Sequence, residues 1–149
     1  MKTLICLWSL LISMPLAACE GNNQSPPAQG SDMLRLNIRV GNRTFSALLY
    51  NNPSSQALAA KMPMTLNMSE LNGNEKYFNL PDRLPTNSKR VGSINNGDLM
   101  LYGDNCLVLF YKSFSTSYSY TKLGFIEDVS GLADILGRGS VQVTFTIAE

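Results

Sequence analysis

Histidine is absent from this 149-residue sequence, and cysteine is scarce, with three residues at positions 6, 19 and 106. Without histidine no Cys-His catalytic pair can form, so that kind of nucleophilic site is excluded. Net charge is also nearly lacking, because 12 Lys and Arg residues stand against 11 Asp and Glu residues. With no excess of positive charge, the composition gives no indication of a nucleic-acid partner.

The first 18 residues have the pattern of a secretory signal peptide. Lys2 is followed by an apolar run, residues 4–14, that is too short to span a bilayer as a stable helix. The segment Leu16-Ala17-Ala18-Cys19 that follows is also a bacterial lipobox, at which the cysteine is acylated. We therefore expect residues 1–18 to be removed and Cys19 to carry lipid. The alternative is an ordinary cleaved signal that ends beside a cysteine.

Lipidation would hold the protein outside the cytoplasm, on the bacterial cell envelope, at the periplasmic or outer-membrane side. Residues 19–33 are expected to hold the lipidated Cys19 and a flexible tether. Residues 20–31 are mainly polar with Pro and Gly, and these twelve residues would span roughly 20 Å. Loss of Lys2 leaves 11 basic against 11 acidic residues, so lipid and not a basic patch would make the membrane contact. Cys106 then has no partner for a disulfide, and we expect it to pack as a small buried hydrophobe.

Residues 34–149 are expected to form one domain that begins with a hairpin. The segments 34–40 and 43–49 both alternate apolar with polar residues and are separated by Gly41-Asn42. A two-residue turn there pairs Val40 with Arg43 and Leu34 with Leu49, which gives both strands one apolar face. Asn52 and Pro53 then predict the start of a short helix.

The central stretch of the domain is a second hairpin, residues 95–112. Two apolar runs, Leu99 to Tyr102 and Cys106 to Tyr111, flank Gly103-Asp104-Asn105, which suits a tight turn. Neither run alternates apolar with polar residues. Both faces of these strands must therefore be covered, as in the middle of a sandwich or small barrel.

The remaining segments predict short strands and one further helix. We expect strands at 64–68 and 75–78 around Asn72-Gly73-Asn74, then a loop over 80–97 with an extended piece at 91–94. After the central hairpin we expect a polar link at 113–117 and a strand at 118–126. A helix at 132–136, capped by Ser130 or Asp128 and ended by Gly137, precedes a last strand at 141–147. The last strand has the same half-polar pattern as the first. Pairing of the two would close a barrel.

Several separated motifs resemble a bacterial family of cyclophilin-like domains. They are Thr65-Leu66-Asn67-Met68, Asn72-Gly73-Asn74-Glu75-Lys76-Tyr77, Leu84-Pro85, Gly97-Asp98-Leu99-Met100-Leu101-Tyr102-Gly103 and Phe110-Tyr111. The resemblance covers about residues 34 to 147. It implies an all-β fold, a closed eight-stranded antiparallel barrel of the cyclophilin type with two short helices, one over each end.

Cyclophilins isomerise the peptide bond before proline, and an arginine in their site assists as amide conjugation is lost. The resemblance places that arginine on the strand after the first helix, here Met64 to Glu70, which contains none. The partner histidine and tryptophan are missing from residues 19–149 as well. The six arginines, at 35, 39, 43, 83, 90 and 138, are expected at solvent-facing strand positions, a turn or loops. Such a site uses no cofactor and no metal, and we expect neither.

Candidate binding residues lie near the predicted turns. Asn74, Glu75 and Tyr77 follow the first of these turns, Tyr102 and Asn105 stand at the tip of the central hairpin, and Tyr111 and Tyr118 are among the tyrosines that offer a flat apolar face with a hydrogen-bonding end. Plain turn chemistry and strand packing are the alternatives for all seven. Glu70 and Glu75 are five residues apart, but nothing in the sequence makes them a catalytic pair.

Three functions remain open at this point. The first is a lipid-anchored domain that binds an extended peptide or a small ligand without isomerase chemistry. The second is a peptidyl-prolyl isomerase with a relocated arginine, for which Arg83 and Arg90 are the loop candidates. The third is a structural docking module of an envelope complex.

Overall fold

The first hairpin has the register that the alternating pattern predicts. The structure is a computed structural model that describes residues 32–149, and in it β1 (Leu34–Val40) pairs with β2 (Arg43–Leu49). Val40 faces Arg43 and Leu34 faces Leu49, which confirms the two-residue turn at Gly41-Asn42. The predicted signal peptide, the lipidation site Cys19 and nearly all of the tether lie outside the described residues.

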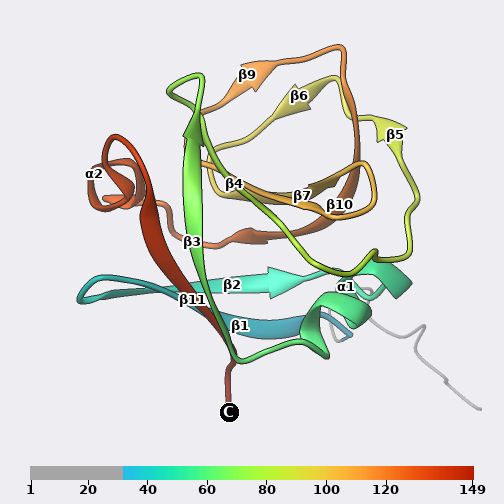
Figure 1. Cartoon of the computed structure of the whole chain (residues 1–149), viewed down its shortest axis with the longest axis horizontal. Coiled ribbons are helices and arrows are strands. Elements are labelled where there is room, and N and C mark those ends of the chain that lie inside the picture. The colour runs from blue at the N-terminus through green and yellow to red at the C-terminus, as the bar shows by residue number, and fades with distance from the viewer. Residues whose placement is uncertain (1–31) are drawn as a thin grey trace, which may run out of the picture.

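Eight strands form a closed antiparallel barrel (Figure 1). The strands that follow the first hairpin are β3 (Met64–Leu71), β4 (Glu75–Asn79), β5 (Lys89–Arg90), β6 (Ser93–Ile94), β7 (Asp98–Tyr102), β8 (Cys106–Phe110), β9 (Phe114–Ser115), β10 (Ser119–Ile126) and β11 (Val141–Ile147). The ring runs β2-β1-β11-β3-β4-β8-β7-β10, and β10 pairs back to β2. Its strands β1 and β11, from the two ends of the domain, pair as expected. The predicted fold is confirmed.

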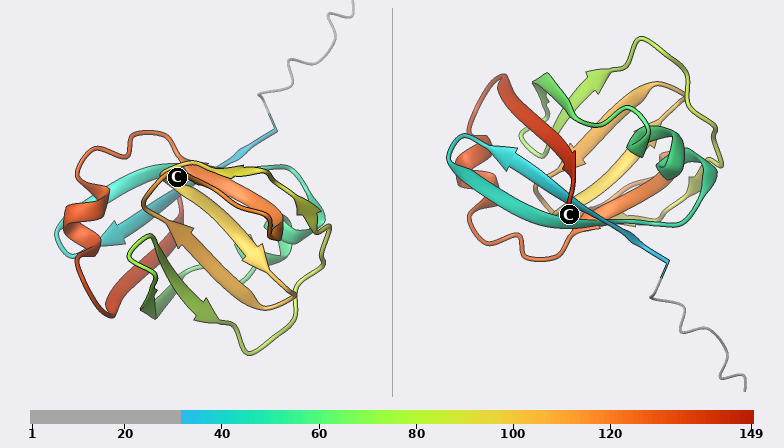
Figure 2. Two further views of the ribbon diagram at one scale, coloured as in Figure 1. Left: turned by 90° about the horizontal axis from the view of Figure 1, so that it is seen from above. Right: turned by 90° about the horizontal axis from the view of Figure 1, so that it is seen from below.

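One short helix lies at each end of the barrel (Figure 2). Helix α1 (Pro53–Ala59) begins as predicted, because the Asn52 side chain accepts a hydrogen bond from the Ser55 amide at 2.8 Å. Helix α2 (Leu132–Leu136) ends at Gly137 as predicted, but the expected side-chain cap is wrong. Its N-cap is Gly131, at a positive φ of 76°, and the Asp128 carboxylate instead accepts from the amide of Ser130 before the helix.

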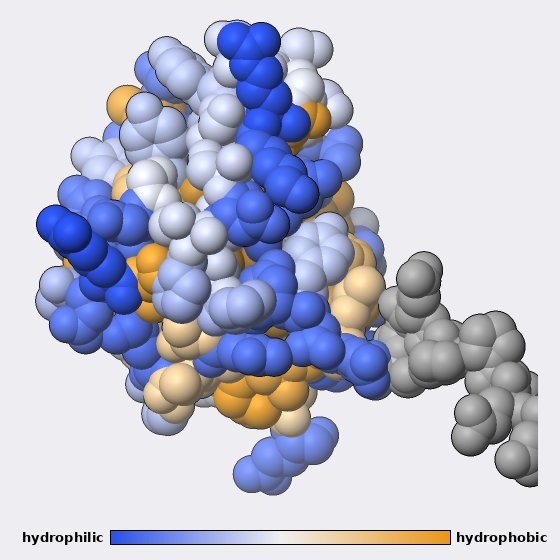
Figure 3. Space-filling view, turned by 90° about the vertical axis from the view of Figure 1, so that its right-hand side faces the viewer, coloured by the Kyte–Doolittle hydropathy of each residue, from blue (hydrophilic) through white to orange (hydrophobic). Residues whose placement is uncertain are grey.

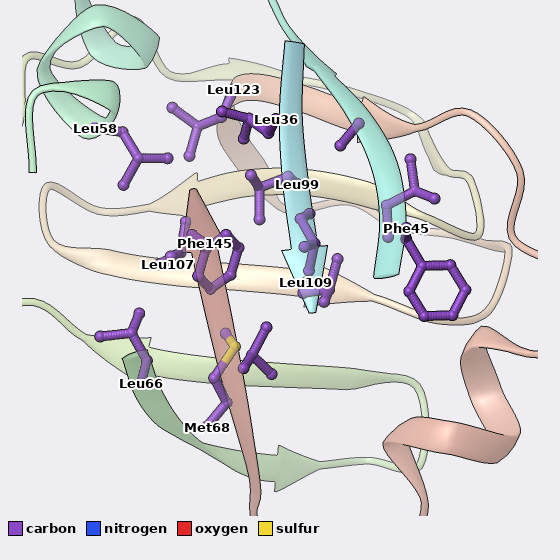
Figure 4. Packing of buried hydrophobic residues seen from close by; sticks show 14 of the residues in the cluster. Leu36, Phe45, Leu58, Leu66, Met68, Leu99, Leu107, Leu109, Leu123 and Phe145 are labelled. Carbon is purple, nitrogen blue, oxygen red and sulfur yellow. The ribbon is translucent and has the colours of Figure 1, made fainter. Parts of the chain in front are cut away.

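The barrel interior is filled by side chains from alternate positions of the ring strands and from both helices. Figure 4 shows Leu36, Leu99, Leu107, Leu109 and Phe145 converging on this interior, with Leu58 entering from α1. Each of these residues is nearly or completely buried. The interior is therefore a packed core, and two grooves large enough for a ligand are lined by residues on the outside of the barrel.

A second, smaller apolar cluster covers the outer face of β7 and β8. It contains Ile94, Met100, Val108, Phe110 and Tyr120, and Phe114 packs against it. The two-stranded sheet β6-β9 supplies Ile94 and Phe114 as the cover. This explains why the central hairpin does not alternate, as predicted. It also corrects the expectation for residues 113–117, since a strand lies within that polar link.

Candidate functional site

A groove lies on the outer side of the barrel and is lined by residues of the β3-β4 turn and of the segment that contains β9. Figure 1 shows where these two segments lie. We call this groove the tyrosine groove. Its lining residues are Leu71, Asn72, Asn74, Glu75, Tyr77, Tyr102, Cys106, Val108, Phe114, Ser115, Thr116, Ser117, Tyr118 and Tyr120, around a volume of about 520 Å³. That volume falls in the range typical of sites for small organic ligands.

Strand alternation decides which side chains reach the groove. On β4, Glu75 and Tyr77 point outward, and their partners on β8 are Phe110 and Val108, which belong to the outer cluster. Lys76 lies between them and points to the interior, opposite Leu109. Two neighbouring residues of one strand therefore have different environments.

Three of the tyrosines that line the groove form a contiguous set of rings. The ring centroids of Tyr102 and Tyr118 are 6.3 Å apart at an interplanar angle of 78°, and those of Tyr102 and Tyr120 are 5.7 Å apart at 56°. Tyr102 is 50% exposed and Tyr118 is 62% exposed, whereas Tyr120 is buried. Large aromatic side chains exposed side by side offer contact area to a ligand.

Glu75 is the charged group of the groove, and it is only 9% exposed. Burial, and then repulsion from Glu70, raise the pKa of its carboxyl group. The charge of Glu75 in turn acts on its neighbours. Burial and Glu75 together raise the pKa of the Cys106 thiol, and burial followed by Glu75 are the main causes that raise the pKa of Tyr120 to about 12.

Behind the groove wall, a buried ion pair occupies the end of the barrel next to α2. Lys76 is completely buried, its Nζ atom lies 2.7 Å from Oε2 of Glu70, and it donates hydrogen bonds to the carbonyls of Gly137 and Gly139 at 2.9 and 2.6 Å. The Tyr111 hydroxyl donates to the other carboxylate oxygen of Glu70. Burial alone would raise the pKa of Glu70, but the Lys76 ammonium and the Tyr111 hydroxyl lower it. This cluster is structural, since Lys76 has no path to solvent.

The structure brings five of the seven predicted site residues to the groove and leaves two elsewhere. Asn74, Glu75, Tyr77, Tyr102 and Tyr118 line it. Tyr111 is buried and contacts Glu70 through its hydroxyl. The side-chain amide of Asn105 donates a hydrogen bond to the Leu80 carbonyl at 3.0 Å.

Sequence reasoning missed two parts of the site. The segment 114–117 forms one wall, and Cys106 lies half-buried at the groove instead of packing fully. Cys106 shares the outward side of β8 with Val108, so strand alternation indicates its place once the outer face is known. The polar composition of 113–117 gave no comparable signal.

A second groove lies on the side of the barrel where α1 and β5 are found. Asn52, Pro53, Pro85, Lys89, Arg90, Tyr120 and Lys122 are among its lining residues, around about 550 Å³. Figure 3 views the side of the molecule on which α1 and β5 lie and shows hydrophilic side chains over most of it. Three of the named residues are cationic, so the two grooves, which share Tyr120, differ in the sign of their charge.

No arginine lines the tyrosine groove. All six arginines are exposed. The side chain of Arg83 is 86% exposed and lies 3.4 Å from the carboxylate of Asp104, whereas Arg90 borders the second groove.

Residues 32–149 contain neither a metal-binding cluster nor a membrane-spanning helix. No cluster of three or more histidine, cysteine or acidic side chains that could hold a metal ion is found in this part of the chain. In the same range no helix is long and apolar enough to cross a bilayer.

Comparison with known proteins identifies one family and one similar structure. The model of the family described as "Cyclophilin-like family" matches residues 38–147, which is most of the chain. The solution structure of a hypothetical protein from Archaeoglobus fulgidus is similar with a TM-score of 0.54 and 22% sequence identity, covering 78% of this chain and 95% of that one. At this identity the likeness concerns the fold alone. No curated protein matches the chain.

Proposed function

The chain belongs to the cyclophilin-like family, and on that premise we propose that its domain binds an extended peptide or a small ligand in the tyrosine groove, without classical isomerase chemistry. The observation that carries the proposal is the set of polar groups left open there. Within residues 32–149, the hydroxyls of Tyr77, Tyr102, Tyr118 and Tyr120 take part in no hydrogen bond with the protein. Groups of this kind are available to a ligand.

The shape and composition of the groove support an extended ligand. Its two walls come from separate parts of the chain, the β3-β4 turn and residues 114–118, and its floor contains Val108 and Cys106 of β8. A peptide lying between the walls would meet apolar floor, aromatic faces and hydroxyl groups. An extended peptide is therefore the ligand that we favour, and a small molecule of similar character is the other outcome.

The placement of the arginines supports binding over catalysis. Isomerisation of the cyclophilin type needs a guanidinium beside the twisted amide, and no arginine lines the tyrosine groove. Of the two loop candidates, Arg83 extends into solvent beside Asp104, and Arg90 lies at the other groove. An isomerase with a relocated arginine would therefore have to use the second groove.

A binding screen tests the proposal. Purified protein is immobilised and exposed to a peptide library, and retained peptides are titrated against the wild type and the variants Tyr102→Ala and Tyr118→Ala. Tyr50→Ala is the matched control, because Tyr50 is partly exposed outside the groove. We expect both groove variants to lose affinity and the control to keep it. Equal binding by all four proteins would show that the ligand uses another surface.

Two assays separate the alternatives. A protease-coupled assay on an Ala-Pro peptide should give the uncatalysed rate, and acceleration that is lost in Arg90→Lys would favour the isomerase. Crosslinking in cells tests the docking module. For that function we expect one stable crosslinked protein partner, and we expect that a peptide bound in the tyrosine groove does not compete with it.

We also propose that the domain is attached to the cell envelope through a lipid on Cys19. The lipobox Leu16-Ala17-Ala18-Cys19 supports this, and residues 20–31 would serve as the tether. Mass spectrometry of the protein purified from bacterial membranes should find a diacylglyceryl group on Cys19 as the first residue. In Cys19→Ala we expect the protein to leave the membrane fraction, and an unmodified Cys19 would refute the anchor.

A further inference from the structure

The tyrosine groove carries a negative charge and no positive one. Glu75 is the acidic residue among its lining residues, and no lysine or arginine from residues 32–149 joins it there. Within residues 32–149 the Glu75 carboxylate has no ion-pair partner and accepts no hydrogen bond. The nearby ammonium of Lys76 is directed to the other side of the strand and is engaged by Glu70. The Glu75 residue is only 9% exposed, and an ionised side chain with so little access to water is costly unless something pairs with it.

A second acceptor beside Glu75 is also unsatisfied. The side-chain oxygen of Asn74, which lines the same groove, is buried and has no hydrogen-bond partner in the described part of the chain. Buried polar atoms are normally paired. The Glu75 carboxylate and the Asn74 oxygen therefore both lack a donor from the described part of the chain, and a ligand with N–H donors or positive charge would complement them.

Aromatic rings line the same groove as Glu75. Tyr77 follows Glu75 on the same face of β4, and the exposed rings of Tyr102 and Tyr118 meet edge to face. The faces of tyrosine rings attract organic cations, and the attraction grows when the cation is partly desolvated. A bare metal ion fits poorly, because one carboxylate among rings supplies too few oxygen ligands.

We propose that the tyrosine groove binds an organic ammonium group, with Glu75 as its counter-ion and the rings of Tyr102 and Tyr118 against its carbon atoms. This inference rests on the proposed function, because it names the ligand chemistry of the same groove. The ammonium group can come from a lysine side chain in an extended peptide or from a free amine. The second groove, with Lys89, Arg90 and Lys122, has the wrong sign for such a ligand.

Matched pairs of probes isolate the charge. Choline is compared with 3,3-dimethylbutan-1-ol, which has the same shape and no charge, and Ac-Ala-Lys-Ala-amide is compared with its norleucine counterpart. Binding to the purified protein is followed by calorimetry and by shifts of backbone amide resonances. We expect each cationic probe to bind at least tenfold more tightly than its neutral partner and to shift the resonances of residues 74–77 and 115–118. The affinity should fall as salt is raised.

Variants assign the charge to Glu75. Glu75→Gln keeps the shape of the side chain and should lower affinity for the cationic probes tenfold or more while leaving the neutral ones unchanged. Glu149→Gln makes the same chemical change at the exposed end of the chain and should have no effect. Tyr102→Leu should weaken choline binding several-fold with the fold intact by circular dichroism.

The outcomes separate this inference from the proposed function. Equal affinity for charged and neutral probes, or an equal loss in Glu75→Gln and Glu149→Gln, would overturn the ammonium site. If library peptides without a cation bind the groove, the proposed function is supported and the ammonium site is refuted. If no peptide and no probe shifts a groove resonance, both fail. Binding of the lysine peptide but not of choline would identify a peptide as the source of the ammonium group.

Discussion

The ammonium of Lys76 and the carboxylate of Glu70 form an ion pair at 2.7 Å in which the two partners differ in burial. Lys76 is 0% exposed, whereas the Glu70 side chain is 24% exposed. The loss of either partner should therefore have a different cost. A charge that can reach water is hydrated when its partner is removed, but a fully buried charge is not.

Because of that asymmetry, removal of Glu70 should destabilise the protein more than removal of Lys76 does. Glu70→Met leaves the buried Lys76 ammonium with only the carbonyls of Gly137 and Gly139, and should cost about 3–5 kcal/mol. Lys76→Met leaves a Glu70 side chain that is 24% exposed and that still accepts a hydrogen bond from Tyr111, and should cost less, about 1–3 kcal/mol. Urea denaturation measures both. Lys61→Met, which breaks the more exposed pair with Asp82, is the control and should cost less than about 1 kcal/mol. The reverse order of Glu70 and Lys76 variants would contradict the assignment.

Tyr111 should matter for stability and not for binding. Its hydroxyl donates to Glu70, and its ring is buried within the barrel, away from the tyrosine groove. Tyr111→Phe removes that hydrogen bond and should cost about 1–2 kcal/mol. Affinity for a groove ligand should be unchanged when it is measured at a temperature where the variant is fully folded. If Tyr111→Phe also lost affinity for the groove ligand, Tyr111 would take part in binding, contrary to this prediction.

Glu75 should destabilise the free protein at neutral pH. Its pKa is raised in the folded state above the ordinary value of 4.5, so the folded chain holds this proton more tightly than the unfolded chain does. The stabilising contribution of protonated Glu75 to the folded state is therefore fully present below the pKa of the unfolded chain. It is lost as the pH rises through the pKa of the folded protein. We expect Glu75→Gln to raise stability at pH 7.5 by about 0.5–2 kcal/mol, seen as a Tm higher by a few degrees. The gain should shrink towards pH 4, and a gain that is constant with pH would contradict this origin.

Patterns of apolar residues made most of the barrel predictable. The register of β1 and β2 follows from alternation around Gly41-Asn42, and the doubly apolar β7 and β8 required cover on both faces. The segments that cover the outer face of β7 and β8 could not be predicted from the sequence. Phe114 is a single apolar residue within a polar stretch, and its partner strand lies in a segment rich in turn residues. Periodicity has no information where a strand is two residues long.

The candidate site was partly predictable for the same reason. Turn positions and exposed tyrosines indicated five residues of the groove, because strand ends and turns carry binding groups. The burial of Lys76 could not be predicted from the sequence. It depends on Glu70 across the hairpin and on two carbonyls that lie 61 and 63 residues further along the chain. Long-range polar contacts of this kind leave no local pattern in the sequence.

Gly124 should be indispensable where the barrel closes. It lies on β10, pairs with Leu49 of β2, and a Cβ atom there would stand 2.1 Å from the Leu48 carbonyl oxygen. Backbone on both strands would have to move, so Gly124→Ala should cost about 2–3 kcal/mol or prevent folding. Gly103→Asn is the control, because its positive φ of 62° suits asparagine and no atom lies within 4 Å. Equal melting temperatures for the two variants would show that the β2-β10 contact tolerates movement.

Cys106 offers a chemical report on the charge in the tyrosine groove. Burial, and then the charge of Glu75, raise the pKa of its thiol, and the thiolate is the form that reacts with alkylating agents. Glu75→Gln removes the second cause, so at pH 8 iodoacetamide should modify Cys106 several-fold faster in that variant than in the wild type. Mass spectrometry of the tryptic peptide that contains Cys106 gives the rate at this thiol alone. Glu149→Gln should react like the wild type. If Glu75→Gln left the rate unchanged, the carboxylate would not act on the groove floor, and the electrostatic basis of the ammonium site would be lost.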